Sequence, residues 1–103
     1  MNTSINTHDS LEQLIYHEGL RIQAIDVHKD MDLIVVILNT GSVLRENISK
    51  YTRLKDATPQ MLLNYTLTAK GTGIHWPDVD EDLSLKGLLR DTIKSQVMGG
   101  KVA

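Results

Sequence analysis

The chain has 103 residues, 41% of them hydrophobic, and a formal net charge of −2. A chain of this size folds as one domain that buries roughly 60–70% of the surface its unfolded form exposes, so an aliphatic core needs no cross-links. The absence of cysteine excludes disulfides and thiolate metal ligands. Nucleic-acid binding usually shows as a basic patch; the eleven basic residues form no dense block, although a fold could still assemble one, and we expect no direct binding of nucleic acid.

Residues 1–8 are polar and we expect them to be disordered; without an apolar run they do not form a secretory leader. The segment 9–18 then predicts a short helix. It opens with two overlapping pairs of the capping-box type, Ser10 with Gln13 or Asp9 with Glu12, and Gly19 is a plausible end.

Two strands should follow. In the first, 21–28, several apolar residues compete for the inner face: Ile22, Ala24, and Ile25 or Val27. The second, Leu33–Leu38, is apolar on both faces, which suits a central strand covered on both sides or one that offers a face to a partner. Because one apolar face of this strand could line a contact between two copies, a homodimer stays one of the alternatives. It is far shorter than the ~20 apolar residues of a membrane-spanning helix, and we expect a cytoplasmic protein.

Gly41 can take the positive φ of a tight turn, so residues 31–48 predict a β-hairpin. A short helix should start at Thr58 and Pro59, with three apolar residues packing inward: Met61, Leu62 and Leu63.

Two short strands should then flank a glycine-containing turn within 65–76, where Tyr65, Leu67 and Ala69 alternate. A last helix, capped by Ser84 or Asp82, places four apolar residues on one stripe: Leu85, Leu88, Leu89 and Ile93. The predicted fold is therefore a small single α+β domain, 9–96, with a mostly antiparallel sheet, helices packed on one face, and a frayed tail at 97–103.

The stretch 71–84 holds the only tryptophan and four acids within five residues. Asp78, Asp80 and Asp82 match the D-x-D-x-D with which a calcium loop opens. The sixth and twelfth places of such a loop need glycine and glutamate, but Leu83 and Leu89 occupy them here. No two histidines have zinc-helix spacing, so only a site formed in three dimensions by His75 and Asp78 is left. We expect no metal and no cofactor.

Catalytic motifs are also missing from the sequence. It contains no cysteine nucleophile, no G-x-S-x-G turn and no phosphate-binding loop, so we expect a protein that is not an enzyme. A small hydrolase or metal enzyme that uses His75 as general base is the third alternative for function.

The acids exceed what a helix start needs. Acids ahead of a helix gain about 0.3–1 kcal/mol each, which accounts for one or two of the four. Because unpaired carboxylates are prohibitively expensive to bury, the rest must face water or meet cations. Two compatible interpretations follow: a structural anchor at Trp76 with a solvated acidic turn, or a turn that binds a basic partner. The candidate partner-binding residues are His75, Trp76, Asp78, Asp80, Glu81 and Asp82.

The same stretch resembles the signature G-x-G-I-x-W-P-x-x-D-E-D-L-S-x-x-G-L-L of the small bacterial family known as domain of unknown function 2442. Its matching positions are Gly71, Gly73, Ile74, Trp76, Pro77, Asp80, Glu81, Asp82, Leu83, Ser84, Gly87, Leu88 and Leu89. The preceding "YTRLKDATPQML" is also similar to the family, and the resemblance covers about residues 20–90.

The resemblance implies an α+β fold with an antiparallel sheet and no established activity. Some relatives carry a helix-turn-helix domain, for which too few residues follow Leu89 here, and some are encoded beside another small protein, as in toxin–antitoxin pairs. The first expectation is therefore a non-enzymatic module that binds a protein with a basic surface, in its sharpest form antitoxin-like. The alternative is a ligand-sensing domain that acts with a separate DNA-binding protein.

Overall fold

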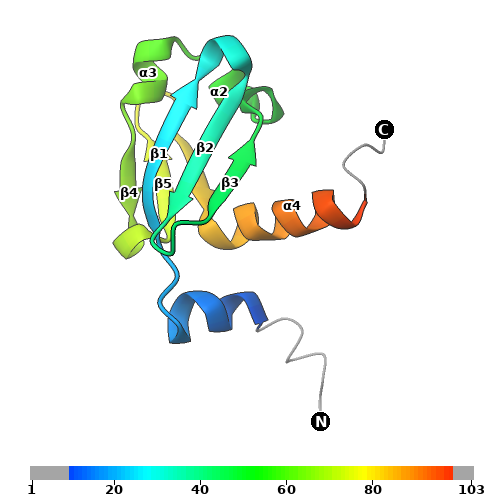
Figure 1. Ribbon diagram of the computed structural model, residues 1–103. Helices are drawn as coiled ribbons and strands as arrows, with labels where there is room; N and C mark the ends of the chain where they lie inside the picture. The colour runs from blue at the N-terminus through cyan, green and yellow to red at the C-terminus, as the bar shows by residue number, and fades with distance from the viewer. Residues whose placement is uncertain (1–9, 99–103) are drawn as a thin grey trace.

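The computed structural model describes residues 10–98, so the predictions for residues 1–9 and for the tail beyond 98 lie outside it. The α+β class and the antiparallel pairing are confirmed, and the strands divide into two three-stranded sheets (Figure 1). Sheet A has the order β1 (Ile22–His28), β2 (Leu33–Leu38), β3 (Val43–Glu46), and sheet B the order β4 (Thr66–Thr68), β5 (Gly73–Trp76), β6 (Glu81–Ser84).

The two sheets enclose one aliphatic core around a single tryptophan. The buried side chains come from the inner faces of both sheets and from the helices: Ile15, Ile22, Ile25, Ile34, Val36, Leu38, Leu44, Ile48, Leu54, Ala57, Leu62, Ile74, Trp76, Leu85, Leu88 and Leu89. None of the helices within residues 10–98 is long and apolar enough to cross a membrane.

The predicted N-terminal helix is present and ends in a π-helical turn, Gln13–His17 (η1). The Glu18 amide donates to the Gln13 carbonyl at 3.0 Å, and Gly19 ends the segment at φ +78°. Of its apolar face only Ile15 is fully buried.

Strand β1 contains an irregularity that explains its ambiguous pattern. The register with β2 shifts between Ile22 and Ala24, so Ile22 and Ile25 both face the core although they are three residues apart. Ala24 points to the opposite face, beside Ile37 of β2.

The β2–β3 hairpin is confirmed, and Gly41 adopts φ +93° in its turn. The inner side of β2 is buried, whereas its outer side is half-buried. None of the helices within residues 10–98 lies over that outer side in Figure 1, where sheet A faces the viewer and sheet B lies behind it.

The middle of the chain forms the 3-10 turn Ile48–Lys50 (η3) and two short helices, α2 (Thr52–Lys55) and α3 (Pro59–Leu63). The Thr58 hydroxyl accepts from the Met61 amide, so the predicted cap is confirmed. The prediction that three residues pack inward is wrong for Met61 and Leu63, which are exposed, because a five-residue helix turns only one position, Leu62, toward the core. The 3-10 turn Lys29–Met31 (η2) joins β1 to β2.

The predicted alternation through Ala69 also fails. Ala69 has φ +49° within the 3-10 turn Ala69–Gly71 (η4), so strand β4 ends at Thr68. β6 was not predicted as a strand: it pairs with β5 and separates the acidic turn from α4 (Leu85–Val97).

Ser84 caps α4 by accepting from the Gly87 amide. Leu85, Leu88 and Leu89 are buried as predicted, but Ile93 is exposed because the C-terminal part of α4 projects away from the sheets (Figure 1).

Candidate functional site

The acidic stretch forms a β-hairpin. In the register of β5 and β6, His75 lies opposite Asp82 and Trp76 opposite Glu81, and residues 77–80 form the connecting turn. Because successive side chains of a strand point to opposite faces, Trp76 and Glu81 share the core side while His75 and Asp82 share the outer side. The six candidate residues therefore do not form one surface.

Trp76 fixes this hairpin to the rest of the domain. Its side chain is fully buried, its indole N–H donates to the Leu62 carbonyl at 2.9 Å, and its ring lies 6.5 Å from that of Tyr65. Trp76 therefore orients the turn, as expected, and is too deep to touch a partner.

The turn itself is held from both sides. The Arg53 guanidinium donates to the Asp80 carbonyl at 2.6 Å, and the Asn64 amide donates to the Asp78 carboxylate at 3.0 Å. Val79 packs partly against the core. These contacts from α2 and from the end of α3 keep the acidic residues in one arrangement.

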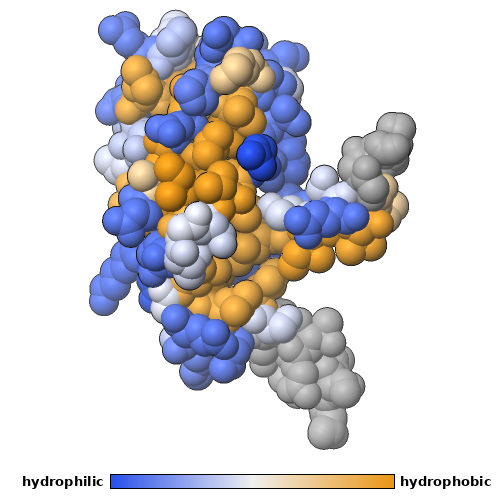
Figure 2. Space-filling view, viewed as in Figure 1, coloured by the Kyte–Doolittle hydropathy of each residue, from blue (hydrophilic) through white to orange (hydrophobic). Residues whose placement is uncertain are grey.

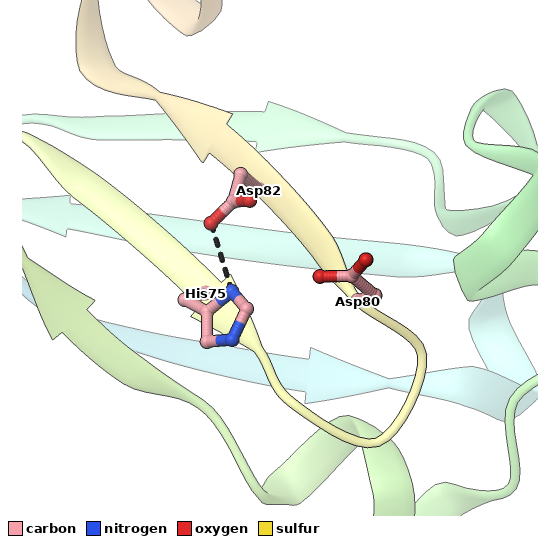
Figure 3. A group of neighbouring side chains, drawn as sticks. All are labelled: His75, Asp80 and Asp82. Carbon is pink, nitrogen blue, oxygen red and sulfur yellow. Dashed lines mark hydrogen bonds and ion pairs between the residues drawn. The ribbon is translucent and has the colours of Figure 1, made fainter.

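Three polar side chains gather on the outer side of the hairpin (Figure 3). The Nδ1 atom of His75 lies 2.8 Å from a carboxylate oxygen of Asp82, and one ligand atom from each of His75, Asp80 and Asp82 lies within 4.8 Å of the others. An ionised Asp82 only accepts, so Nδ1 carries the proton of this bond and Nε2 keeps its lone pair while the ring is neutral. The structure thus joins His75 to Asp82, where sequence spacing suggested Asp78.

The charge of the turn is only partly used within the protein. Asp78 is held by Asn64 and Asp82 by His75, whereas the carboxylates of Asp80 and Glu81 form no hydrogen bond or ion pair with the residues that the structure describes. Asp80 is exposed and Glu81 is half-buried.

The expectation that the α4 N-terminus stabilises one or two of these acids does not hold for the acids on or next to the connecting turn. Strand β6 lies between the turn and the helix, and the first turn of α4 contains no acid. Because the helix field falls off within its first turn, it does not account for Asp78, Asp80 or Glu81.

A second polar cluster, which sequence reasoning missed, joins β3 to α4. Buried Glu46 accepts hydrogen bonds from Lys50 and Tyr51, each at 3.3 Å, and Lys50 also bridges to Asp91 at 2.7 Å. Burial and the nearby negative charge of Glu46 and Asp91 raise the pKa of Tyr51 well above its usual value. Burial opposes the charge of Lys50, but its bonds to Asp91 and Glu46 outweigh this and raise its pKa. Each charge here has a partner within the domain, which indicates a structural role.

The anchors Arg53 and Asn64 were also missed, since nothing in the sequence relates them to acids 27 and 14 residues away. Only the register of the hairpin and the position of the two short helices bring them together.

Two solved structures are similar to this chain, and both proteins are of unknown function. An uncharacterised protein from Chromobacterium violaceum, solved by solution NMR, has a TM-score of 0.64 and 24% identity over 87% of this chain and 82% of that one. A crystal structure of a protein from Rhodospirillum rubrum has a TM-score of 0.63 and 25% identity over 71% of this chain and 88% of that one.

No curated protein matches the chain. The model of the family "Protein of unknown function (DUF2442)" matches residues 23–94, which is well over half of the sequence and includes both sheets except the first residue of β1, and most of α4. The chain belongs to the DUF2442 family.

Proposed function

We propose that this protein is a non-enzymatic binding module whose β5–β6 hairpin presents negative charge to a basic surface on another protein. The observation that carries the proposal is the unused carboxylate of Asp80 on a turn that Trp76, Arg53 and Asn64 hold in place, with the partly exposed Glu81 next to it at the start of β6.

A fixed turn favours binding because its ordering does not have to be supplied by the partner. Preorganised groups lose less conformational entropy when a complex forms. Exposed charges at an interface mainly raise the association rate and select partners of opposite sign, and salt screens them. We therefore expect binding that weakens as ionic strength rises. An antitoxin-like role is one form of this proposal, in which the basic partner is encoded beside this chain.

The test compares the full chain with two doubly neutralised variants as bait in a lysate of the source bacterium. D80N/E81Q removes the free charge of the hairpin, and D30N/D56N removes two exposed acids elsewhere, so both change the net charge equally. We expect a basic protein to be captured by the wild type and by D30N/D56N and to be lost with D80N/E81Q, with all three chains equally stable. Equal capture by both variants, or no basic protein with the wild type, contradicts the proposal.

A second candidate function is the binding of a divalent cation by His75, Asp80 and Asp82. One imidazole nitrogen and two carboxylates suit Zn²⁺ or Mn²⁺ and leave positions open for water. The ligand atoms within 4.8 Å of one another would draw closer around an ion. This is the arrangement that the metal-enzyme alternative would need.

Titration of the protein with ZnCl₂ and with MnCl₂ tests the second candidate. We expect a saturable heat and a raised melting temperature that H75N abolishes and H17N, at an exposed histidine on η1, preserves. Equal responses of H75N and the wild type contradict it. The ligand-sensing alternative has weaker support, because depressions of about 390 Å³ on the described surface are open to solvent.

A further inference from the structure

The outer face of sheet A is apolar along its centre and has no cover within the described residues. The central strand contributes Leu33, Val35 and Ile37, none of which belongs to the core cluster or packs against it. Ala24 and Val43 flank Ile37 on β1 and β3, and Val43 is 42% exposed. Figure 2 shows this face from the direction of Figure 1 and displays a continuous apolar surface over sheet A.

Two opposite charges border this apolar strip at the same level. Asp26 on β1 and Arg45 on β3 both pair with Val35, one on each side, and both are exposed. Neighbouring strands are about 4.8 Å apart, so roughly 10 Å separates the two positions within one chain. Neither side chain forms an ion pair or hydrogen bond with the described residues.

This pattern is self-complementary under one particular two-fold axis. When two copies stack face to face about an axis parallel to β2, β1 of each copy lies over β3 of the other. Asp26 then faces Arg45 of the second copy, twice, and small Ala24 faces the larger Val43. The other in-plane axis, perpendicular to the strands, would set Asp26 against Asp26 and Arg45 against Arg45. Both axes give isologous two-fold contacts, the commonest kind in soluble homo-oligomers, and only the charges distinguish between them.

We propose that a second copy of this chain covers the outer face of sheet A, with β2 of the two copies running in the same direction and two Asp26–Arg45 pairs at the border. Stacked sheets about 10 Å apart would bury the Leu33, Val35 and Ile37 strip of both copies. Sheet B lies behind sheet A, so this dimer leaves both β5–β6 hairpins accessible and does not depend on the function proposed for them (Figure 1).

Light scattering and sedimentation of the full chain over about 1–500 μM test the proposal. We expect a dimer for the wild type, and a dimer at least about tenfold weaker for D26K and for R45D, because each reversal sets like charges against each other twice. The exchanged variant D26R/R45D should regain the wild-type affinity. An equimolar mixture of D26K and R45D should form a heterodimer, because all four facing charges are then opposite.

V35D tests the apolar strip independently of the charges. It should be monomeric with unchanged circular dichroism and a melting temperature that no longer depends on protein concentration. A wild-type chain that stays monomeric at 500 μM overturns the proposal. So does a dimer whose affinity is the same in D26K, R45D and the wild type.

Discussion

The indole N–H of Trp76 donates a hydrogen bond to the main-chain carbonyl of Leu62, although the two residues are fourteen apart in sequence and come from β5 and α3. This bond satisfies the polar atom of the indole, so the largest apolar side chain can be fully buried although it is next to the densest negative charge in the sequence. Strand alternation sends Trp76 into the core and sends His75, its neighbour, to the outer face. Of the four acids only Glu81 shares the side of Trp76; Asp82 points to the outer face and Asp78 and Asp80 lie on the connecting turn.

We predict that W76F lowers the free energy of unfolding by about 2–4 kcal/mol. Phenylalanine leaves a void and an unpaired buried carbonyl at Leu62, and both effects are destabilising. Urea denaturation measures the change. Y65F, which removes a partly buried hydroxyl that donates to Ile25 at 3.3 Å, is the matched aromatic control and should lose less than about 1 kcal/mol. Similar losses in both variants would refute a special role for the indole.

Local signals in the sequence were sufficient for the β2–β3 hairpin and for the α3 cap. Gly41 is followed by a strand that can pair with a β-branched run, and Thr58 directly precedes Pro59, so each prediction rests on residues within a few positions. The same holds for Ser84 at the start of α4.

The candidate site was harder to predict because it depends on register. Spacing along the chain suggested His75 with Asp78, but pairing of β5 with β6 places Asp82 opposite His75. Strand β6 itself carries two acids and a serine, a composition that favours a turn, and it is a strand through its pairing with β5, which Trp76 anchors to the core. The division of the six strands into two sheets likewise depends on contacts between segments far apart in the sequence.

We predict that G71A is more destabilising than G41A. Both glycines have φ near +90°, so an added Cβ costs each about 1–2 kcal/mol. At Gly71 the new atom would also lie 3.2 Å from the Ile22 carbonyl, whereas at Gly41 it meets open space. Chemical denaturation should therefore show an additional loss for G71A. Equal losses would mean that the backbone near Ile22 moves away from the new Cβ atom without any cost in free energy.

We predict that S84A lowers the free energy of unfolding by about 1 kcal/mol, because the Gly87 amide loses its acceptor at the start of α4. S95A, at an exposed position within the same helix, is the matched control and should be neutral or slightly stabilising. Thermal and urea unfolding measure both variants. A loss in S95A as large as that in S84A would contradict the capping role.

Asp32 should make the stability of the protein sensitive to acid. Its two carboxylate oxygens accept from the Ser49 hydroxyl and the Ser49 amide, each at 2.7 Å, and these bonds hold the pKa of Asp32 below its usual value of 3.8. With a lower pKa in the folded protein, the unfolded chain binds more protons, so the free energy of unfolding rises with pH across this range. The contribution is complete above the unfolded pKa and is lost as the pH falls through the folded one.

We therefore predict that D32N is less stable than the wild type at pH 6 and that the difference shrinks between about pH 5 and pH 2. S49A, which removes the hydroxyl but keeps the amide, should show an intermediate loss with the same direction of pH dependence. Urea denaturation at a series of pH values measures both. A difference between D32N and the wild type that stays constant with pH would show that the Ser49 bonds do not favour the charged form of Asp32.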